Sequence, residues 1–292
     1  MLTYDTIKEL VDAASEKGCK ISELCLSDQA DQMGMSEEEV FSKMEGFFDV
    51  MIESADWGLQ EGRKSRSGLT GEEGFSMMKY AQSGKSLMGN ELSKAVARAL
   101  AVSNCNAAMG RIVATPTAGS CGILPGCLIS AYEDRHVDKK DIVMSMITAA
   151  SFGMVVALKA SIAGAEGGCQ AECGSAAGMA AAALVEIQGG TPQMCADALA
   201  IAIANQEGLV CDPVAGLVEI PCTKRNAAGV VIAYSSADMA LAGLEAKIPA
   251  DECILAMKAV GDIMPASLKE TAMGGLAKSP TGQKLKEQVF KE

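Results

Sequence analysis

The sequence has 292 residues, of which 49% are hydrophobic and 21% are charged, and its formal net charge is −12 at pH 7. This is the composition of an ordinary globular protein that can bury a sizeable core, and it excludes a disordered chain. The acidic balance argues against a nucleic-acid-binding protein, because little positive charge is available to neutralise phosphates.

The segment from residue 1 to residue 57 contains two helical patterns. Residues 5–17 form a short amphipathic helix, and a polar link that holds Cys19 and Cys25 follows it. Ser36-Glu37-Glu38-Glu39 is a capping box, and apolar residues then recur at helical spacing. We expect this second helix to run to about Trp57.

Two loops are expected between residues 62 and 90, separated by a helix near residues 72–82. The first, GRKSRSGLTGEEG (62–74), concentrates positive charge. It is either a solvated loop or a contact for an anionic substrate or a partner. The second, SGKSLMGN (83–90), has part of a phosphate-binding loop but lacks the rest of the Walker pattern, and no strand precedes it.

A long helix at residues 91–109 leads into ATPTAGSCGILPG (114–126), where four small residues precede a helix that begins near Leu124. These residues are Thr117, Gly119, Ser120 and Gly122. Small residues at a helix N-terminus expose backbone N–H groups that can bind an anion. A tight turn between two helices would have the same composition, so both interpretations stay open.

The C-terminal half also has helical periodicity. Residues 142–158 are uncharged, and we interpret the helix at 139–159 as a buried core helix, not a membrane span. Further helices are expected at 173–187, 193–207, 230–244 and 249–261, then a short piece at 265–270 and a final helix in the last ten residues. No run of β-branched and aromatic residues is long enough to anchor a sheet, since aromatic residues make up only 4%. The prediction is an all-α fold, a single helical domain over residues 1–292.

The eleven cysteines do not indicate a disulfide scaffold. The chain is long for such a scaffold, and MLTYDTIKELVD carries acidic residues without an apolar stretch after it, unlike a signal peptide. We therefore expect reduced thiols and a cytoplasmic protein.

Cys169, Cys211 and Cys222 lie in Gly- or Pro-rich segments, where side-chain direction matters more than packing volume. An antiparallel pair formed by the helices at 173–187 and 193–207 would bring these segments together. Thiolates suit zinc and iron–sulfur clusters. From spacing alone the signal is weak, because no CxxC pair is present and buried cysteines are often simply small apolar residues.

Three motifs, GCQAE, LVCDPVAGLVEIPCTKRNA and ATPTAGSCGILPG, resemble the alpha chain of the iron–sulfur L-serine dehydratases, and the resemblance extends from about residue 85 to about residue 275. It implies that Cys169, Cys211 and Cys222 hold an oxygen-sensitive [4Fe–4S] cluster. It also implies dehydration of L-serine to pyruvate and ammonia, with an iron that has no protein ligand acting as a Lewis acid. Single-chain members of the family end in a cysteine, whereas this chain ends in QVFKE, so we expect an open iron.

The resemblance also assigns expected roles around the cluster. It favours a substrate-carboxylate site at Thr117, Gly119 and Ser120, and it places Lys85 near the active site. Arg225 and Asn226 are expected to contact the substrate or the surroundings of the cluster. The catalytic base stays open between Glu172, Lys85 and Ser120.

Cys121 and Cys173 occupy positions where the family pattern does not require cysteine, and Cys173 is the alternative ligand. The resemblance further implies a separate beta chain as partner.

Three other functions compete with this interpretation. The first is a cysteine desulfidase that uses the same cluster. The second is a dehydratase dependent on pyridoxal phosphate, with Lys85 as the Schiff-base lysine and the TAGSCG loop as its phosphate site. The third is a cluster-bearing sensor or assembly subunit without catalytic activity.

Overall fold

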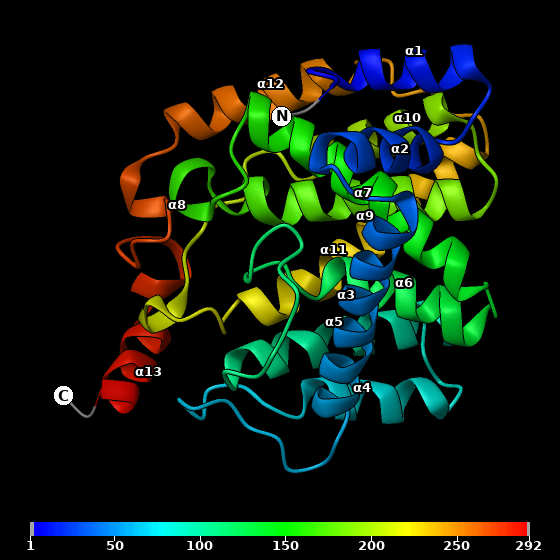
Figure 1. Ribbon diagram of the computed structural model, residues 1–292. Helices are drawn as coiled ribbons and strands as arrows, with labels where there is room; N and C mark the ends of the chain where they lie inside the picture. The colour runs from blue at the N-terminus through cyan, green and yellow to red at the C-terminus, as the bar shows by residue number, and fades with distance from the viewer. Residues whose placement is uncertain (1–2, 291–292) are drawn as a thin grey trace.

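A computed structural model describes residues 3–290 of the chain, which form a bundle of helices joined by short loops (Figure 1). The α-helices are α1 (Ile7–Lys17), α2 (Ile21–Met33), α3 (Glu37–Gly58), α4 (Glu73–Gln82), α5 (Asn90–Ala107), α6 (Ile123–Asp134), α7 (Lys139–Lys159), α8 (Gly164–Gly167), α9 (Ser175–Ile187), α10 (Pro192–Ala204), α11 (Cys222–Leu241), α12 (Ala250–Ile263) and α13 (Pro280–Phe290). A π-helical turn, η1 (Gln170–Gly174), precedes α9, and the short 3₁₀ turns are η2 (Val214–Gly216), η3 (Ala266–Leu268) and η4 (Gly275–Lys278).

The all-α prediction is confirmed, because residues 3–290 contain no β-strand. Their only β-type pairing outside helices is an isolated bridge between Cys211 and Lys269. The capping box at Ser36 is also confirmed: its hydroxyl accepts from the N–H of Glu39, whose carboxylate accepts from the N–H of Ser36.

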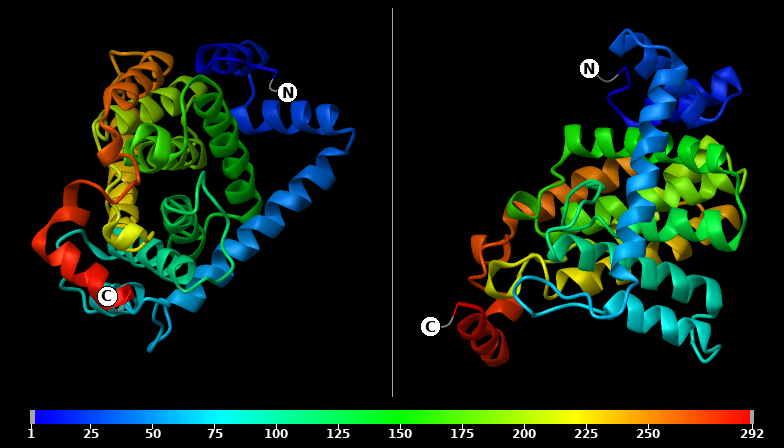
Figure 2. Two further views of the ribbon diagram at one scale, coloured as in Figure 1. Left: turned by 90° about the vertical axis from the view of Figure 1, so that its left-hand side faces the viewer. Right: turned by 60° about the horizontal axis from the view of Figure 1, so that its bottom comes forward.

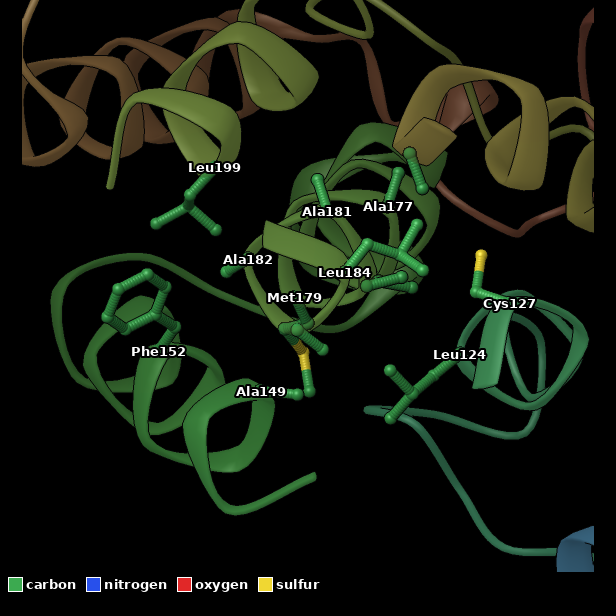
Figure 3. Packing of buried hydrophobic residues seen from close by; sticks show 14 of the residues in the cluster. Leu124, Cys127, Ala149, Phe152, Ala177, Met179, Ala181, Ala182, Leu184 and Leu199 are labelled. Carbon is green, nitrogen blue, oxygen red and sulfur yellow. The ribbon is translucent and has the colours of Figure 1, made fainter. Parts of the chain in front are cut away.

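Helix α9 lies at the centre of the bundle and contacts α6, α7, α10 and α11 (Figures 1 and 3). It consists largely of alanine, so neighbouring helices approach its backbone closely. At Gly178 a Cβ atom would lie 2.5 Å from the Cδ1 atom of Leu199 on α10. A side chain at Gly178 would have to displace that of Leu199, so the small residues of α9 allow the close packing at the centre.

Helix α5 is the second centre of packing, and α3, α4, α6 and α11 contact it. Gly58 of α3 and Gly74 of α4 both approach Ala101 on α5. A Cβ atom on Gly58 would lie 2.0 Å from the carbonyl oxygen of Ala101. Figure 2 shows α3 crossing the outside of the bundle, from the N-terminal helices at one end to α4 at the other.

Helix α7 is long and apolar enough to cross a membrane by length and composition. However, 67% of its apolar window is buried inside the protein. It packs against α2, α3 and α9. This burial supports the interpretation of α7 as a core helix.

Two expectations about helices were wrong. The polar link after residue 17 is instead helix α2, which Gly34 terminates with a φ of 62°. Its apolar residues show only weak helical periodicity, yet Ile21 and Leu24 are buried in the core. Helix α11 begins at Cys222, eight residues before the expected start at residue 230, because the buried Asn226 is held by hydrogen bonds to the distant loop at residues 114–122.

Candidate active site

The three predicted ligand cysteines come from three segments. Cys169 precedes the π-helical turn before α9, Cys211 lies in the link after α10, and Cys222 is the first residue of α11. All three side chains are buried. As expected, the antiparallel packing of α9 and α10 brings the first two segments together, and the N–H of Gln170 donates to the carbonyl of Leu209 at 2.9 Å.

Arg225 connects α11 to the segment that contains Cys211. Its Nη1 atom donates to the carbonyl of Val210 at 2.7 Å, and its Nη2 atom donates to Oδ1 of Asp212 at 2.8 Å. The charge of its guanidinium also helps to lower the pKa of the Cys169 thiol. The structure therefore places this predicted site residue among the cysteines, with an aspartate as its direct partner.

Electrostatics distinguish Cys169 from the other two thiols. Its pKa is lowered, first by a hydrogen bond with Cys173, whose Sγ atom is 3.4 Å away, and then by the charge of Arg225. Burial raises the pKa of Cys222 to about 12, and burial likewise raises that of Cys211. Nearby Cys169 and Glu172 add to both increases. Cys169 is thus the thiol that ionises most readily.

The three cysteines are a soft, thiolate donor set, which is the type of ligand that iron–sulfur clusters use. Among residues 3–290, no three cysteine, histidine or acidic side chains converge closely enough to hold one metal ion. In a cluster each cysteine binds a different iron, so its sulfurs do not need to converge on one point. Three buried thiols beside a guanidinium are suited to that chemistry. Cys173 lies next to Cys169, so it stays the alternative ligand.

Glu172 brings a carboxylate into the same place. Its Oε1 atom accepts a hydrogen bond of 2.8 Å from Thr117. A Cβ atom on Gly164 would lie 2.8 Å from Oε2 of Glu172 and 3.0 Å from Sγ of Cys211, so this glycine separates the carboxylate from the thiol. Burial raises the pKa of Glu172, Glu270 adds to the increase, and the hydrogen bond from Thr117 opposes it.

The loop at residues 114–122 lies against Glu172. A Cβ atom on Gly119 would lie 3.0 Å from Oε1 of Glu172. The hydroxyl of Ser120 is fully buried, lies 3.1 Å from that of Thr117 and donates to the carbonyl of Thr115 at 3.2 Å. Thr117 and Gly119 therefore border the glutamate, and Ser120 is linked to it through Thr117.

Asn226 joins this loop to the turn at Cys222. Its Oδ1 atom accepts from the N–H of Gly122 at 2.8 Å. Its Nδ2 atom donates to the carbonyls of Gly119 at 2.8 Å and Cys222 at 3.0 Å. Both the oxygen and the nitrogen of its side-chain amide are hydrogen-bonded, so Asn226 fixes the position of the loop relative to the Cys222 turn.

Lys85 is the one predicted site residue that the structure does not bring to the others. It is exposed in the turn between α4 and α5, where its carbonyl accepts from the hydroxyl of Tyr80. The loop at 114–122 follows the opposite end of α5, and a helix of 18 residues spans about 27 Å.

A C-terminal segment that sequence reasoning did not assign to the site also borders Cys211. The N–H of Cys211 donates to the carbonyl of Leu268, and the N–H of Glu270 donates to the carbonyl of Cys211, both at 2.8 Å. Asp212 Oδ2 accepts from the N–H of Leu276 at 2.7 Å. In the left panel of Figure 2, this orange-to-red segment lies on the face turned to the viewer.

Comparison with known proteins identifies close relatives along nearly the whole chain. The family described as "Serine dehydratase alpha chain" matches residues 16–277. A probable L-serine dehydratase alpha chain of Bacillus subtilis is 48% identical over 98% of this chain and 95% of its own length. The L-serine dehydratase alpha chain of Peptoniphilus asaccharolyticus is 47% identical over 99% of both chains. An L-serine dehydratase of Mycobacterium tuberculosis is 37% identical over 94% of this chain, which corresponds to 61% of that longer protein.

Proposed function

The chain belongs to the serine dehydratase alpha-chain family, and we propose that it removes water from L-serine to give pyruvate and ammonia. The observation that carries this proposal is the meeting of Cys169, Cys211 and Cys222 with the buried carboxylate of Glu172. Removing water from serine requires a base for the weakly acidic α-hydrogen and help for a poor leaving group, hydroxide.

In this proposal Cys169, Cys211 and Cys222 hold a [4Fe–4S] cluster, whose chemistry here is that of a Lewis acid toward the leaving hydroxyl. The buried thiols and the lowered pKa of Cys169 support this assignment. Arg225 offsets the negative charge of the thiolates, and Asp212 orients its guanidinium.

Glu172 is the proposed general base that takes the α-proton of serine. Burial raises the pKa of this carboxylate toward neutral pH, and a base transfers protons most effectively when its pKa is near the working pH. Thr117 fixes one of its oxygens by a hydrogen bond and leaves the other directed toward Gly164. The proton taken by Glu172 then leaves with the hydroxyl as water, and the aminoacrylate product hydrolyses to pyruvate and ammonia.

The loop at residues 117–120 is the proposed contact for the substrate carboxylate. Gly119 borders Glu172 and Ser120 contacts Thr117, so a carboxylate bound at this loop would place the α-carbon near the base. Asn226 keeps this loop aligned with the Cys222 turn. Lys85 has no role in this mechanism because of its distance along α5, and the same distance disfavours a pyridoxal-phosphate site there.

We also propose that a beta chain completes the enzyme and that it works in the cytoplasm. The alpha-chain relatives match over nearly their whole length, whereas the longer M. tuberculosis relative contains substantial additional sequence. The name alpha chain, which the relatives matched over nearly their whole length carry, supports a separate partner chain.

The test is pyruvate formation from L-serine by protein purified without oxygen, together with its beta chain. We expect activity that air destroys and that iron with a reductant restores. Sulfide release from L-cysteine, measured in parallel, separates the dehydratase from a desulfidase. Full activity in iron-free protein, or faster turnover of cysteine than of serine, would overturn the proposal.

A further inference from the structure

The loop between α3 and α4 folds into a compact unit around Ser65. The N–H of Ser65 donates to the carbonyl of Thr70 at 3.0 Å. The hydroxyl of Ser65 accepts from the N–H groups of Gly68 and Thr70 at 3.2 and 3.4 Å. At Gly71 a Cβ atom would lie 2.4 Å from the carbonyl oxygen of Arg63, so the two ends of the loop touch.

A buried carboxylate from a distant part of the chain holds this loop. Glu219 is 5% exposed and lies three residues before Cys222. Its Oε1 atom accepts from the hydroxyl of Ser67, and its Oε2 atom accepts from that of Thr70, both at 2.7 Å. Each oxygen of this carboxylate is thus bound by one hydroxyl of the loop, and such bonds to a charged group are among the stronger ones in proteins.

The backbone of Glu219 is in turn part of the turn that begins α11. Its carbonyl accepts from the N–H of Thr223 at 3.0 Å, and the N–H of Val214 donates to the carbonyl of Ile220 at 2.8 Å. The position of the loop is therefore coupled to that of Cys222.

We propose that Glu219 is a positioning residue that latches the loop of residues 62–71 onto the Cys222 turn, and that the cations of the latched loop assist the binding of serine. Lys64 and Arg66 are exposed on this loop, in a protein with a net charge of −12. Positive charge fixed at the edge of a site attracts the carboxylate of a substrate. The benefit to serine rests on the proposed function, whereas the latch itself is a property of the fold.

The chain carries its own reporter of the latch. Trp57 is the only tryptophan, and the guanidinium of Arg63 lies 4.6 Å from its ring centroid. Trypsin cleaves after lysine and arginine, so it will act at Lys64 and Arg66 when the loop opens. Both measurements work on the full chain, with or without iron.

We expect Glu219→Ala to be cleaved in the loop at least ~10-fold faster than the natural sequence, because two hydrogen bonds to a charged group are lost. In the same variant, a neutral quencher should quench Trp57 fluorescence more strongly, because the indole ring becomes more accessible. Glu61→Ala, which removes an exposed carboxylate beside the same loop, is the matched control and should behave like the natural sequence. Glu219→Gln keeps an acceptor and should partly restore protection.

Kinetics then test the link to the substrate. In the complete enzyme, Glu219→Ala should raise KM for L-serine several-fold and change kcat less. A variant with Ser67→Ala and Thr70→Val removes the same hydrogen bonds from the loop side, and it replaces Glu219→Ala if that variant does not fold.

Cleavage no faster than in Glu61→Ala would overturn the latch. Faster cleavage with an unchanged KM would overturn its role in substrate positioning. Absence of serine turnover in the natural sequence would instead refute the proposed function and leave the cleavage result standing.

Discussion

The carboxylate of Glu172 and the thiol of Cys211 approach the same point on Gly164, where a Cβ atom would lie 2.8 Å from the first and 3.0 Å from the second. The proposed base and a proposed cluster ligand are therefore neighbours, although 38 residues separate them in the sequence (211 − 172 − 1). Gly164 is needed here because any side chain would displace one of these groups.

Gly164→Ala should therefore lower kcat about 100-fold, because a displacement of about 1 Å is enough to misalign a catalytic group. Gly46→Ala in α3 is the matched control, since no atom lies within 4 Å of its Cβ position. That change should leave kcat unaltered and stabilise the helix by up to about 1 kcal/mol. Equal kcat values for the two variants would contradict the crowded geometry at Gly164.

Glu172→Gln should lower kcat by ~100-fold or more, because a glutamine cannot accept the α-proton. As a base, Glu172 must be deprotonated, so activity should fall as the pH drops through its raised pKa. Thr117→Val removes a hydrogen bond that lowers this pKa, so the acid limb of the kcat–pH profile should move to higher pH. If the acid limb of the kcat–pH profile does not move in Thr117→Val, Glu172 is not the group whose titration causes it.

Asp212→Ala should destabilise the iron-free protein by roughly 3 kcal/mol, because it leaves the guanidinium of Arg225 without its buried partner. The side chains of this pair are only 4% and 15% exposed. The matched control, Asp262→Ala, breaks an exposed ion pair with Lys258 and should cost no more than about 0.5 kcal/mol. Urea unfolding checks both values, and equal losses would refute the structural role of Asp212.

Glu186 provides a test of pH-dependent stability away from the site. Its carboxylate is buried between α9 and α7, where it accepts from the hydroxyl of Thr148 at 2.6 Å, and burial raises its pKa above the ordinary 4.5. The folded protein then keeps a proton that the unfolded chain releases. The stability due to this group is present below pH 4.5 and is lost as the pH rises through the raised pKa.

Glu186→Gln should consequently reduce the loss of stability between about pH 5 and about pH 8, because the variant has no proton to lose. Urea midpoints at the two pH values measure this difference. An identical pH dependence in the variant and the natural sequence would show that Glu186 does not titrate differently on folding.

Most helices could be predicted from the sequence because their apolar spacing and their caps agree. The capping box at Ser36 and the apolar run at 142–158 are examples. Helix α2 was missed because tertiary packing of Ile21 and Leu24, rather than periodicity, stabilises it. The start of α11 was missed for a similar reason, since Asn226 is polar yet fully buried and bonded to the distant loop at residues 114–122.

The candidate site was predicted through motifs, but a motif does not show which distant segments its residues contact. Glu219 and Asp212 lie between the cysteines in sequence, but their partners, Thr70 and Leu276, are far away along the chain. Only the fold reveals such pairs. Lys85 is the opposite kind of error. Its segment resembles part of a binding loop in sequence, but the fold places it at the end of α5 away from the candidate site.

The central claim is that Cys169, Cys211 and Cys222 together hold the iron–sulfur cluster on which serine dehydration depends. Its most direct test is the iron and acid-labile sulfide content of protein purified without oxygen, in the natural sequence and in alanine variants of these cysteines, of Cys173 and of Cys19. The account predicts that each of the first three variants loses iron, sulfide and pyruvate formation together, whereas Cys19→Ala and Cys173→Ala retain all three. Full iron and sulfide content in the alanine variant of Cys169, Cys211 or Cys222 would contradict the assignment. Loss of iron and sulfide from Cys173→Ala would contradict it as well.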